Sequence, residues 1–552
     1  MPQEQMVLHR IDWQSTFAFT RLFGGFRSAL HSTKIVLALA GLLLTFLLGG
    51  VLDFLWVHAG QGVWPGEITG YTASGTQSGY VQNMADIRYG RLADILLRTA
   101  VAKNQAEALQ QAKANPSSAT EMAEERLVEQ YRIRREAAGP PEIRAQLHRE
   151  MQSQLQELNS LRPIGPFHEF AGFQMSAARN AVFAATQMRF TDGLDSVVRG
   201  EVGPQPSVLG SLVMLWYGLI WLLKMHYVYA LFFGPAVLAI WSLAGGGISR
   251  AAIVQFAKDE RIGIREALRF AAGRFWGFFF APIVSFAFIL AFGLLLIAAG
   301  LVGSIPFVGD ILVGVLWFLA LVAGLAIAFI TIGLLAGGSI FAPVVAAEGS
   351  DAFDAISRGF VYVYSRPWKS ILYGVTLVIY GSLCYLFLRF FVFLMLSATH
   401  AFVGAGMLAS RPESGPGLRK LDVVWQAPTF ADLRPHTLDW QMLGVGEVVL
   451  FFFIAVWTYL VWGVLQSWLI SFYFSGSSMA YLLLRKDVDA IDIEEIYAEE
   501  EPEPETLADA AAAPAPAAAT PPAPAAAAPQ TPVADSPSPA APPASDASPP
   551  AI

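Results

Sequence analysis

Long apolar runs recur along this chain and constrain its fold more than any other feature. About 20 apolar residues are enough for a helix to cross the hydrocarbon core of a bilayer. Only 14% of the 552 residues are charged, against about 25% in an ordinary soluble domain. The runs therefore predict an all-α, polytopic membrane helical bundle. The six predicted spans are residues 35–57, 226–247, 276–301, 311–335, 371–396 and 447–474.

A further apolar segment, residues 207–223, stands directly before the second span. Lys224 and His226 separate the two runs by almost nothing. Two straight helices joined so closely are not expected to cross the membrane independently. We therefore predict that 207–223 is an interfacial or re-entrant approach to the second span.

Basic residues in short loops mark the cytoplasmic side of a membrane protein. With six spans, fifteen Lys and Arg residues fall on the side of the N-terminus and four on the other side, long domains being left out. This distribution predicts that both termini lie in the cytoplasm, in a multi-pass protein of the cell (cytoplasmic or inner) membrane. The first run has a long preceding region and no small-x-small site after it, so we expect an anchor and not a cleaved signal.

This topology divides the chain into five parts. Residues 1–34 form a cytoplasmic amphipathic lead-in, and 35–57 form the first span. Residues 58–206 form an inserted extracytoplasmic domain. Residues 207–486 form the five-span membrane domain, and 487–552 form a cytoplasmic tail.

The inserted domain, residues 58–206, has a helical pattern throughout. A Pro140–Pro141 pair suits a helix start, and Ala123, Leu127 and Tyr131 predict a partner helix for a small helical domain or coiled hairpin. Fifteen basic and sixteen acidic residues nearly balance, so nothing favours nucleic acid as a partner. The apolar positions at helical spacing are Ile143, Leu147, Met151, Leu155, Leu158 and Leu161.

The tail accounts for the acidity of the whole chain. The net charge is −8, but residues 487–552 hold thirteen Asp and Glu and no Lys or Arg, so the remainder carries +5. Residues 507–552 are almost entirely Ala and Pro with some Ser, Thr and Asp. Such a composition buries too little apolar surface to offset chain entropy, which predicts a disordered, Pro-rich tail.

Short amphipathic segments precede the first, third and fifth spans, and we expect them to lie on the inner membrane surface as elbows. Ser350 or Asp351 can cap the helix before the fifth span. Three elbow-plus-hairpin units, with the outer domain inserted into the first, are one interpretation of this recurrence. The predicted apolar stripes are Ile264, Leu268, Ala271 and Phe275, and Phe353, Ile356 and Phe360. The residues predicted at the headgroup boundary are Arg261, Arg265, Arg269, Arg274, Trp276, Arg358, Arg366, Trp368 and Lys369.

Two motifs carry a resemblance to a known family. The first comprises Pro343, Glu348, Gly349, Ala352, Ala355, Ile356, Arg358 and Trp368; the second comprises Tyr481, Leu484, Arg485 and Asp487. With these, residues 225–496 resemble the six-span membrane domain that accompanies some glycerophosphodiester phosphodiesterases and occurs in related prokaryotic membrane proteins. In that family catalysis resides in a separate barrel domain, which this chain does not resemble. The resemblance thus implies a membrane scaffold without the phosphodiesterase activity.

No motif in the sequence indicates an enzyme. The eight histidines are dispersed, and no zinc-binding pair, Walker loop, nucleophile elbow or dinucleotide fingerprint is present. The single cysteine, Cys384, lies in an apolar run and excludes disulfides within the chain. We therefore predict no catalytic, metal-binding or cofactor-binding residues.

Ionisable residues inside apolar runs are the remaining candidates, because an unpaired charge in hydrocarbon is costly. The possible intramembrane polar positions are Asp53, Lys224, Arg389 and Glu447. Arg389 is the deepest, and we expect it to pair with Glu447 or Asp53 inside the bundle. A structural role is favoured for these residues over a transport pathway.

The sequence favours a non-enzymatic membrane scaffold or assembly factor. Its expected partners are the lipid bilayer and proteins bound through 58–206 or 487–552. The alternative is a transporter or channel for a small solute or lipid, and a membrane-embedded lipid enzyme is the weakest hypothesis.

Overall fold

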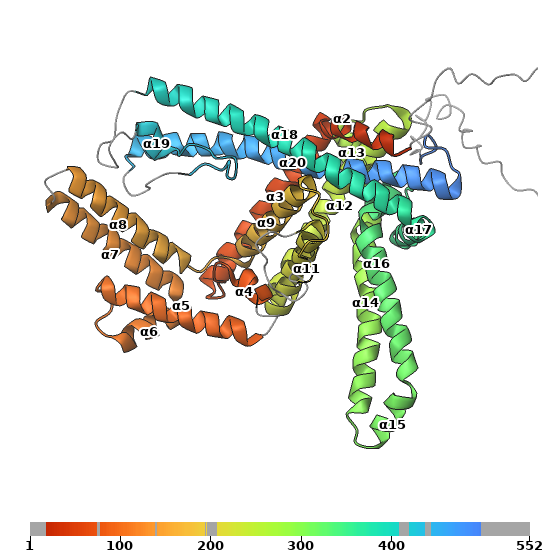
Figure 1. Ribbon diagram of the computed structural model, residues 1–552, viewed down its shortest axis with the longest axis horizontal. Coiled ribbons are helices and arrows are strands. Elements are labelled where there is room, and N and C mark those ends of the chain that lie inside the picture. The colour runs from red at the N-terminus through yellow and green to blue at the C-terminus, as the bar shows by residue number, and fades with distance from the viewer. Residues whose placement is uncertain are drawn as a thin grey trace, which may run out of the picture. The chain divides into compact units, whose positions relative to one another are not determined.

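The computed structural model describes residues 18–73, 78–137, 141–193, 195, 207–407, 419–436 and 443–497 (Figure 1). The regular elements over these residues are helices, and an isolated antiparallel bridge joins Val63 to Ile164. The all-α prediction is therefore confirmed for the described ranges. Residues 498–552, most of the predicted disordered tail, lie outside them.

Within the described residues, seven helices have the length and apolar composition to cross a membrane. Six of them overlap the six predicted spans, so the chain is a multi-pass membrane protein. The seven are α3 (Ser32–His58), α11 (Val208–Met225), α12 (Tyr227–Lys258), α14 (Phe275–Gly303), α16 (Trp317–Glu348), α18 (Pro367–Gly406) and α20 (Val445–Asp489).

The seventh candidate span, α11, differs from the prediction for residues 207–223. It is one uninterrupted helix of 18 residues, and His226 alone separates it from α12. The backbone of His226 leaves the helical region, with φ −128° and ψ 46°. The prediction rested on the close spacing of two helices that were not expected to cross independently. A single non-helical residue is enough to separate them and reverse the chain, which makes α11 a seventh candidate span.

α11 packs antiparallel against α9 (Pro166–Thr186). At one end, Val208 N donates to Arg189 O (3.0 Å); midway, Gln174 Nε2 donates to Leu215 O (3.0 Å). The first turn of α9 and the first turn of α12 both contact Asp53 of α3. The α9–α11 pair therefore begins and ends at the same end of the bundle. For this reason α12 starts at the end of the bundle from which the six-span topology has it start.

The N-terminal segment of the described chain meets the C-terminal half of α20. Ser471 Oγ donates to Ala29 O (2.8 Å), and Lys34 Nζ donates to Ser475 Oγ (3.3 Å). Residues 22–34 and the C-terminal half of α20 therefore lie together at one end of the bundle. We call this the terminal end of the bundle, and the opposite end, at Asp53, the distal end.

Short helices precede three of the spans, as the amphipathic segments predict. Each packs against the terminal-end half of a longer helix where a glycine permits close approach: Gly25 of the first faces Phe472, Gly247 faces Ala267, and Gly337 faces Gly359. The first elbow packs against α20 and the other two against α12 and α16, which fits three elbow-plus-hairpin units. These helices are η1 (Ala18–Gly24), α2 (Gly25–Ala29), α13 (Ile264–Gly273) and α17 (Ala352–Ser365).

The buried face of α13 differs from its predicted apolar stripe. Ala267, Phe270 and Ala271 are buried, whereas Ile264 and Leu268 are exposed. Ala267 is the residue that lies against Gly247 of α12, where its small side chain permits the close approach, and the Phe270 ring packs against the guanidinium of Arg250. The larger aliphatic side chains are left for the surroundings of the bundle. On α17, the predicted cap is confirmed: Asp351 Oδ1 accepts from Asp354 N (2.9 Å).

The segment between α3 and α9 is helical, as predicted. Its core includes Ala123 and Leu127 of α7 and Leu158 of α8, which confirms the predicted partner helices. Ile143 is exposed despite its place in the α8 pattern. The helices here are α4 (Glu67–Ala73), α5 (Ser78–Arg98), α6 (Gln105–Ala114), α7 (Pro116–Ala137) and α8 (Pro141–Ser160); elsewhere are α15 (Val308–Val315) and α19 (Lys420–Val424).

The folded unit extends past the predicted tail boundary at residue 486. α20 ends at Asp489, where Ala490 turns the chain with φ 56°. Residues 491–497 then return to the bundle, and Ile493 is buried. The compact unit ends at Tyr497.

Candidate functional site

The four predicted intramembrane polar residues occupy three different settings. Asp53 accepts from Phe167 N and His168 N (both 2.9 Å), in the first turn of α9, and from the Tyr229 hydroxyl. A carboxylate suits a helix N-terminus because unpaired N–H groups and the helix dipole favour negative charge there. Asp53 therefore fixes the start of α9 to the distal end of α3.

Glu447 and Lys224 lie at helix ends. Glu447 Oε2 accepts from Gly444 N (2.9 Å) at the start of α20, and its other oxygen lies 3.8 Å from Lys420 Nζ. Lys224 is exposed in the last turn of α11. Neither residue lies in the middle of a span.

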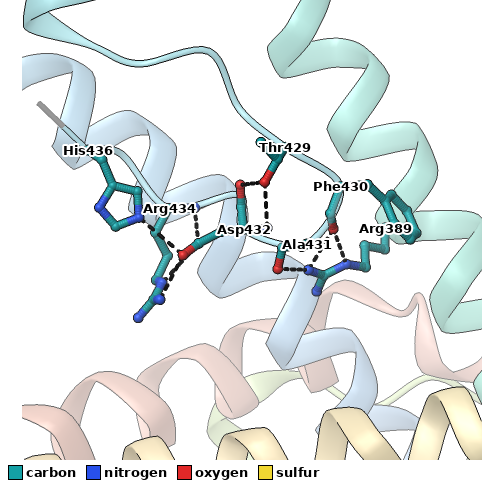
Figure 2. Close-up of polar contacts among 7 residues, drawn as sticks. All are labelled: Arg389, Thr429, Phe430, Ala431, Asp432, Arg434 and His436. Carbon is teal, nitrogen blue, oxygen red and sulfur yellow. Dashed lines mark hydrogen bonds and ion pairs between the residues drawn. The ribbon is translucent and has the colours of Figure 1, made fainter. Parts of the chain in front are cut away.

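Arg389 does not pair with Glu447 or Asp53, so that prediction was wrong. Its guanidinium donates to Phe430 O from Nε (3.0 Å) and Nη2 (2.8 Å), and Nη2 also donates to Ala431 O (2.7 Å), as Figure 2 shows. Nη1 donates to the Tyr385 hydroxyl (3.3 Å). Backbone carbonyls can satisfy the donors of an arginine without a carboxylate. Among the described residues no carboxylate forms an ion pair with Arg389, so its charge is hydrogen-bonded there but not neutralised.

The segment that supplies these carbonyls is held by Asp432. Its carboxylate accepts from Arg434 Nε (3.0 Å) and Nη2 (2.8 Å) and contacts His436 Nε2 (3.1 Å), while the backbone N–H of Asp432 donates to the Thr429 hydroxyl (3.1 Å) (Figure 2). Partial burial raises the pKa of Asp432, but the hydrogen bonds from Arg434 outweigh it and hold the pKa well below its usual range. Asp432 and Arg434 are therefore a charged pair at neutral pH.

A cavity of about 260 Å³ opens beside this segment, between α9, α18 and α20. Three arginines line it, Arg179, Arg389 and Arg434, against one carboxylate, Asp432. Because Asp432 and Arg434 neutralise each other, Arg389 and Arg179 leave an excess of two positive charges. Of these four charged residues, only Arg389 was proposed from the sequence, because Arg179 lies on a helix too polar to be predicted as a span.

A second polar cluster lies at the terminal end, around Glu348 at the end of α16. Arg358 Nη1 lies 2.6 Å and Arg485 Nε 3.3 Å from its two oxygens, and the Tyr481 hydroxyl donates to it (2.5 Å). Arg358, one of the residues predicted at the headgroup boundary, joins α17 to α16 through Glu348 and also bonds Asp354 of its own helix.

Tyr497 is seated in the same region. Its N–H donates to Ala347 O (2.8 Å), its carbonyl accepts from Arg250 Nη2 (2.8 Å), and its hydroxyl accepts from Arg274 Nη2 (3.1 Å). Its ring lies against Gly349, where an added Cβ would be 3.1 Å from it. We call these contacts the Tyr497 anchor. Sequence reasoning assigned this residue to the tail, although the alternation of Ile with acidic residues from 491 to 496 is a signal of a half-buried segment.

The remaining predicted elbow residues are mostly exposed. Trp276 and Trp368 expose 64% and 81% of their surface, as side chains at a headgroup boundary would. Lys369 pairs with Asp487 (2.8 Å). Arg261, Arg265, Arg269 and Arg366 are exposed.

No group of three or more His, Cys, Asp and Glu side chains within the described ranges could hold a metal ion. No family model, curated protein or solved structure matches this chain. The resemblance to the phosphodiesterase-associated membrane domain is therefore without support from a matching family. What stands is the coarser description of a polytopic helical membrane protein.

Proposed function

We propose that this protein is a non-enzymatic membrane scaffold or assembly factor. It would hold its helical domain on one side of the membrane and its acidic, Ala/Pro-rich tail on the other. The Tyr497 anchor carries this proposal. A tail that leaves from a point fixed by Arg250, Arg274 and Ala347 is held at a defined place on the membrane bundle.

The distal end supports the same role. Asp53 binds the N–H groups of Phe167 and His168, and Glu169 accepts from Gly66 N (3.1 Å) and Ile68 N (3.3 Å). The bridge between Val63 and Ile164 closes the base of the inserted helices. The start of α9 is thus joined to α3 through Asp53 and to the segment before α4 through Glu169, by partly buried and exposed bonds.

The orientation follows from the charge pattern. Residues 22–34 and the C-terminal half of α20 lie together at the terminal end, where the elbows with their basic residues also pack. We propose that the terminal end faces the cytoplasm and that the protein resides in the cell membrane.

The experiment compares three forms purified from native membranes in mild detergent: the full chain, a form ending at Tyr497 and a form ending at Glu505. Ending at Tyr497 keeps the anchor intact, whereas ending at 486 would remove it. We expect a stoichiometric protein partner that the full chain retains and the Tyr497 form loses. The Glu505 form separates the acidic run from the Ala/Pro run. A protein that emerges alone in all three forms contradicts the proposal.

The second candidate function is transport, and the arginine-lined cavity between α18 and α20 favours it. Against it, the guanidinium of Arg389 is engaged by Phe430, Ala431 and Tyr385. Flux assays would follow if the scaffold test failed.

A further inference from the structure

We propose that the cavity between α9, α18, α20 and residues 431–434 binds an oxyanion, a phosphate or carboxylate group, carried by an amphiphile. This site is independent of the scaffold function and holds whether or not the tail binds a partner.

The charge of the cavity wall carries the proposal. Arg389 is only 5% exposed, and a buried cation without a counter-charge is costly. Its bonds to carbonyl oxygens satisfy donors but add no negative charge. An anion in the cavity would supply that charge.

Arg179 is the second cationic side chain of the wall. It projects from α9, is exposed, and has no acidic side chain of the described chain within ion-pair distance. A guanidinium presents paired N–H donors that match the oxygens of phosphate and carboxylate groups. Arg179 is therefore free to close on a ligand without breaking a contact that holds the fold.

The rest of the lining points to an amphiphile rather than a bare ion. Val182, Trp462 and Leu469 supply apolar surface beside Ser176 and Gln466. The volume of about 260 Å³ lies just below the roughly 300–1,000 Å³ of pockets that enclose drug-sized ligands. A headgroup would fit, while its chains would lie outside along the spanning helices α18 and α20.

The test compares the full chain with Arg179→Gln and a control, Arg91→Gln. Arg91 is an exposed arginine of α5 with no place in the cavity, so the control removes the same charge elsewhere. Native mass spectrometry would measure the retention of phosphatidylglycerol and of diacylglycerol with matched chains, a lipid that lacks an oxyanion. Inorganic phosphate, tested by thermal shift, would represent a soluble anion.

We expect tight retention of one phosphatidylglycerol, weakened roughly tenfold by Arg179→Gln, as the loss of one charge-assisted hydrogen bond implies. Arg91→Gln should retain it unchanged. If phosphate also stabilises the protein and Arg179→Gln removes that effect, the oxyanion can come from a soluble source and the site is still supported. Equal retention of both lipids with no response to phosphate, or full retention by Arg179→Gln, would overturn the proposal.

Discussion

Arg250 donates a 2.8 Å hydrogen bond to the carbonyl oxygen of Tyr497, a residue 247 positions further along the chain. The same guanidinium donates to Ala346 O (2.9 Å) and lies 4.3 Å from the Phe270 ring centroid. One nearly buried arginine thus connects α12, α13, α16 and the last residue of the folded unit.

Replacing Arg250 with Gln should lower the melting temperature of the detergent-solubilised protein. The change leaves the carbonyls of Ala346 and Tyr497 without their charged donor, at a cost of about 1–3 kcal/mol. Arg265→Gln, at an exposed position of α13, is the matched control and should melt like the wild type. Equal melting of the two variants would show that the anchor does not contribute to stability.

Removing the Tyr497 anchor by truncation should also lower the stability of the protein. A chain ending at residue 486 loses the buried Ile493 and every contact of Tyr497, whereas a chain ending at Tyr497 keeps them. We expect the first to melt well below the second in the same detergent. Identical melting curves would place residues 487–497 in the tail, as the sequence pattern suggested.

Asp53→Ala should loosen the start of α9. The substitution removes the acceptor for Phe167 N, His168 N and the Tyr229 hydroxyl, and each lost charge-assisted bond contributes about 1.5–3 kcal/mol. Hydrogen exchange should rise at residues 167–168 while the amides of α7 keep their protection. Gly165→Ala should act alike, because its Cβ would lie 1.9 Å from Asp53 Cγ. Unchanged exchange in both variants would contradict this account.

Local patterns in the sequence predicted the features that depend on neighbouring residues. Apolar runs located six spans, Asp351 identified a helix start, and the spacing of Leu127 and Leu158 predicted two partner helices. Each of these depends on side chains within a few turns of one another.

Local patterns could not predict contacts between segments that lie far apart in the sequence. Arg389 was predicted to pair with carboxylates because the sequence shows which side chains are charged. Every residue has a backbone carbonyl, so the sequence does not show that those of Phe430 and Ala431 are the partners. Tyr497 looked like part of an acidic tail because its partners, Arg250 and Arg274, lie more than 200 residues away. The place of Arg179 in the cavity depends on α9 packing beside α18.

Arg389→Gln should release the segment around Phe430 and Ala431. Glutamine cannot reach both carbonyls and the Tyr385 hydroxyl, so the buried acceptors would lose partners, at about 1–3 kcal/mol for each acceptor left buried and unsatisfied. Limited proteolysis should cut residues 426–436 faster than in the wild type. Arg179→Gln, which lines the same cavity but has no such bonds, should leave the cleavage rate unchanged. Equal rates for both variants and the wild type would show that Arg389 does not hold this segment.

The close contact between α16 and α17 makes a final prediction about Gly337. A Cβ at this position would lie 3.1 Å from Gly359 O and 3.3 Å from Gly359 C, so Gly337→Val forces the two helices apart, at about 1–3 kcal/mol for such overpacking. Gly324→Ala, on the same helix with open space around it, should instead be neutral or stabilising by roughly 0.4–1 kcal/mol, because alanine restricts the unfolded chain. Thermal unfolding in one detergent would compare them. A Gly337→Val protein as stable as wild type would mean that α17 does not need this close approach, and that it is held against α16 mainly by Glu348 and Arg358.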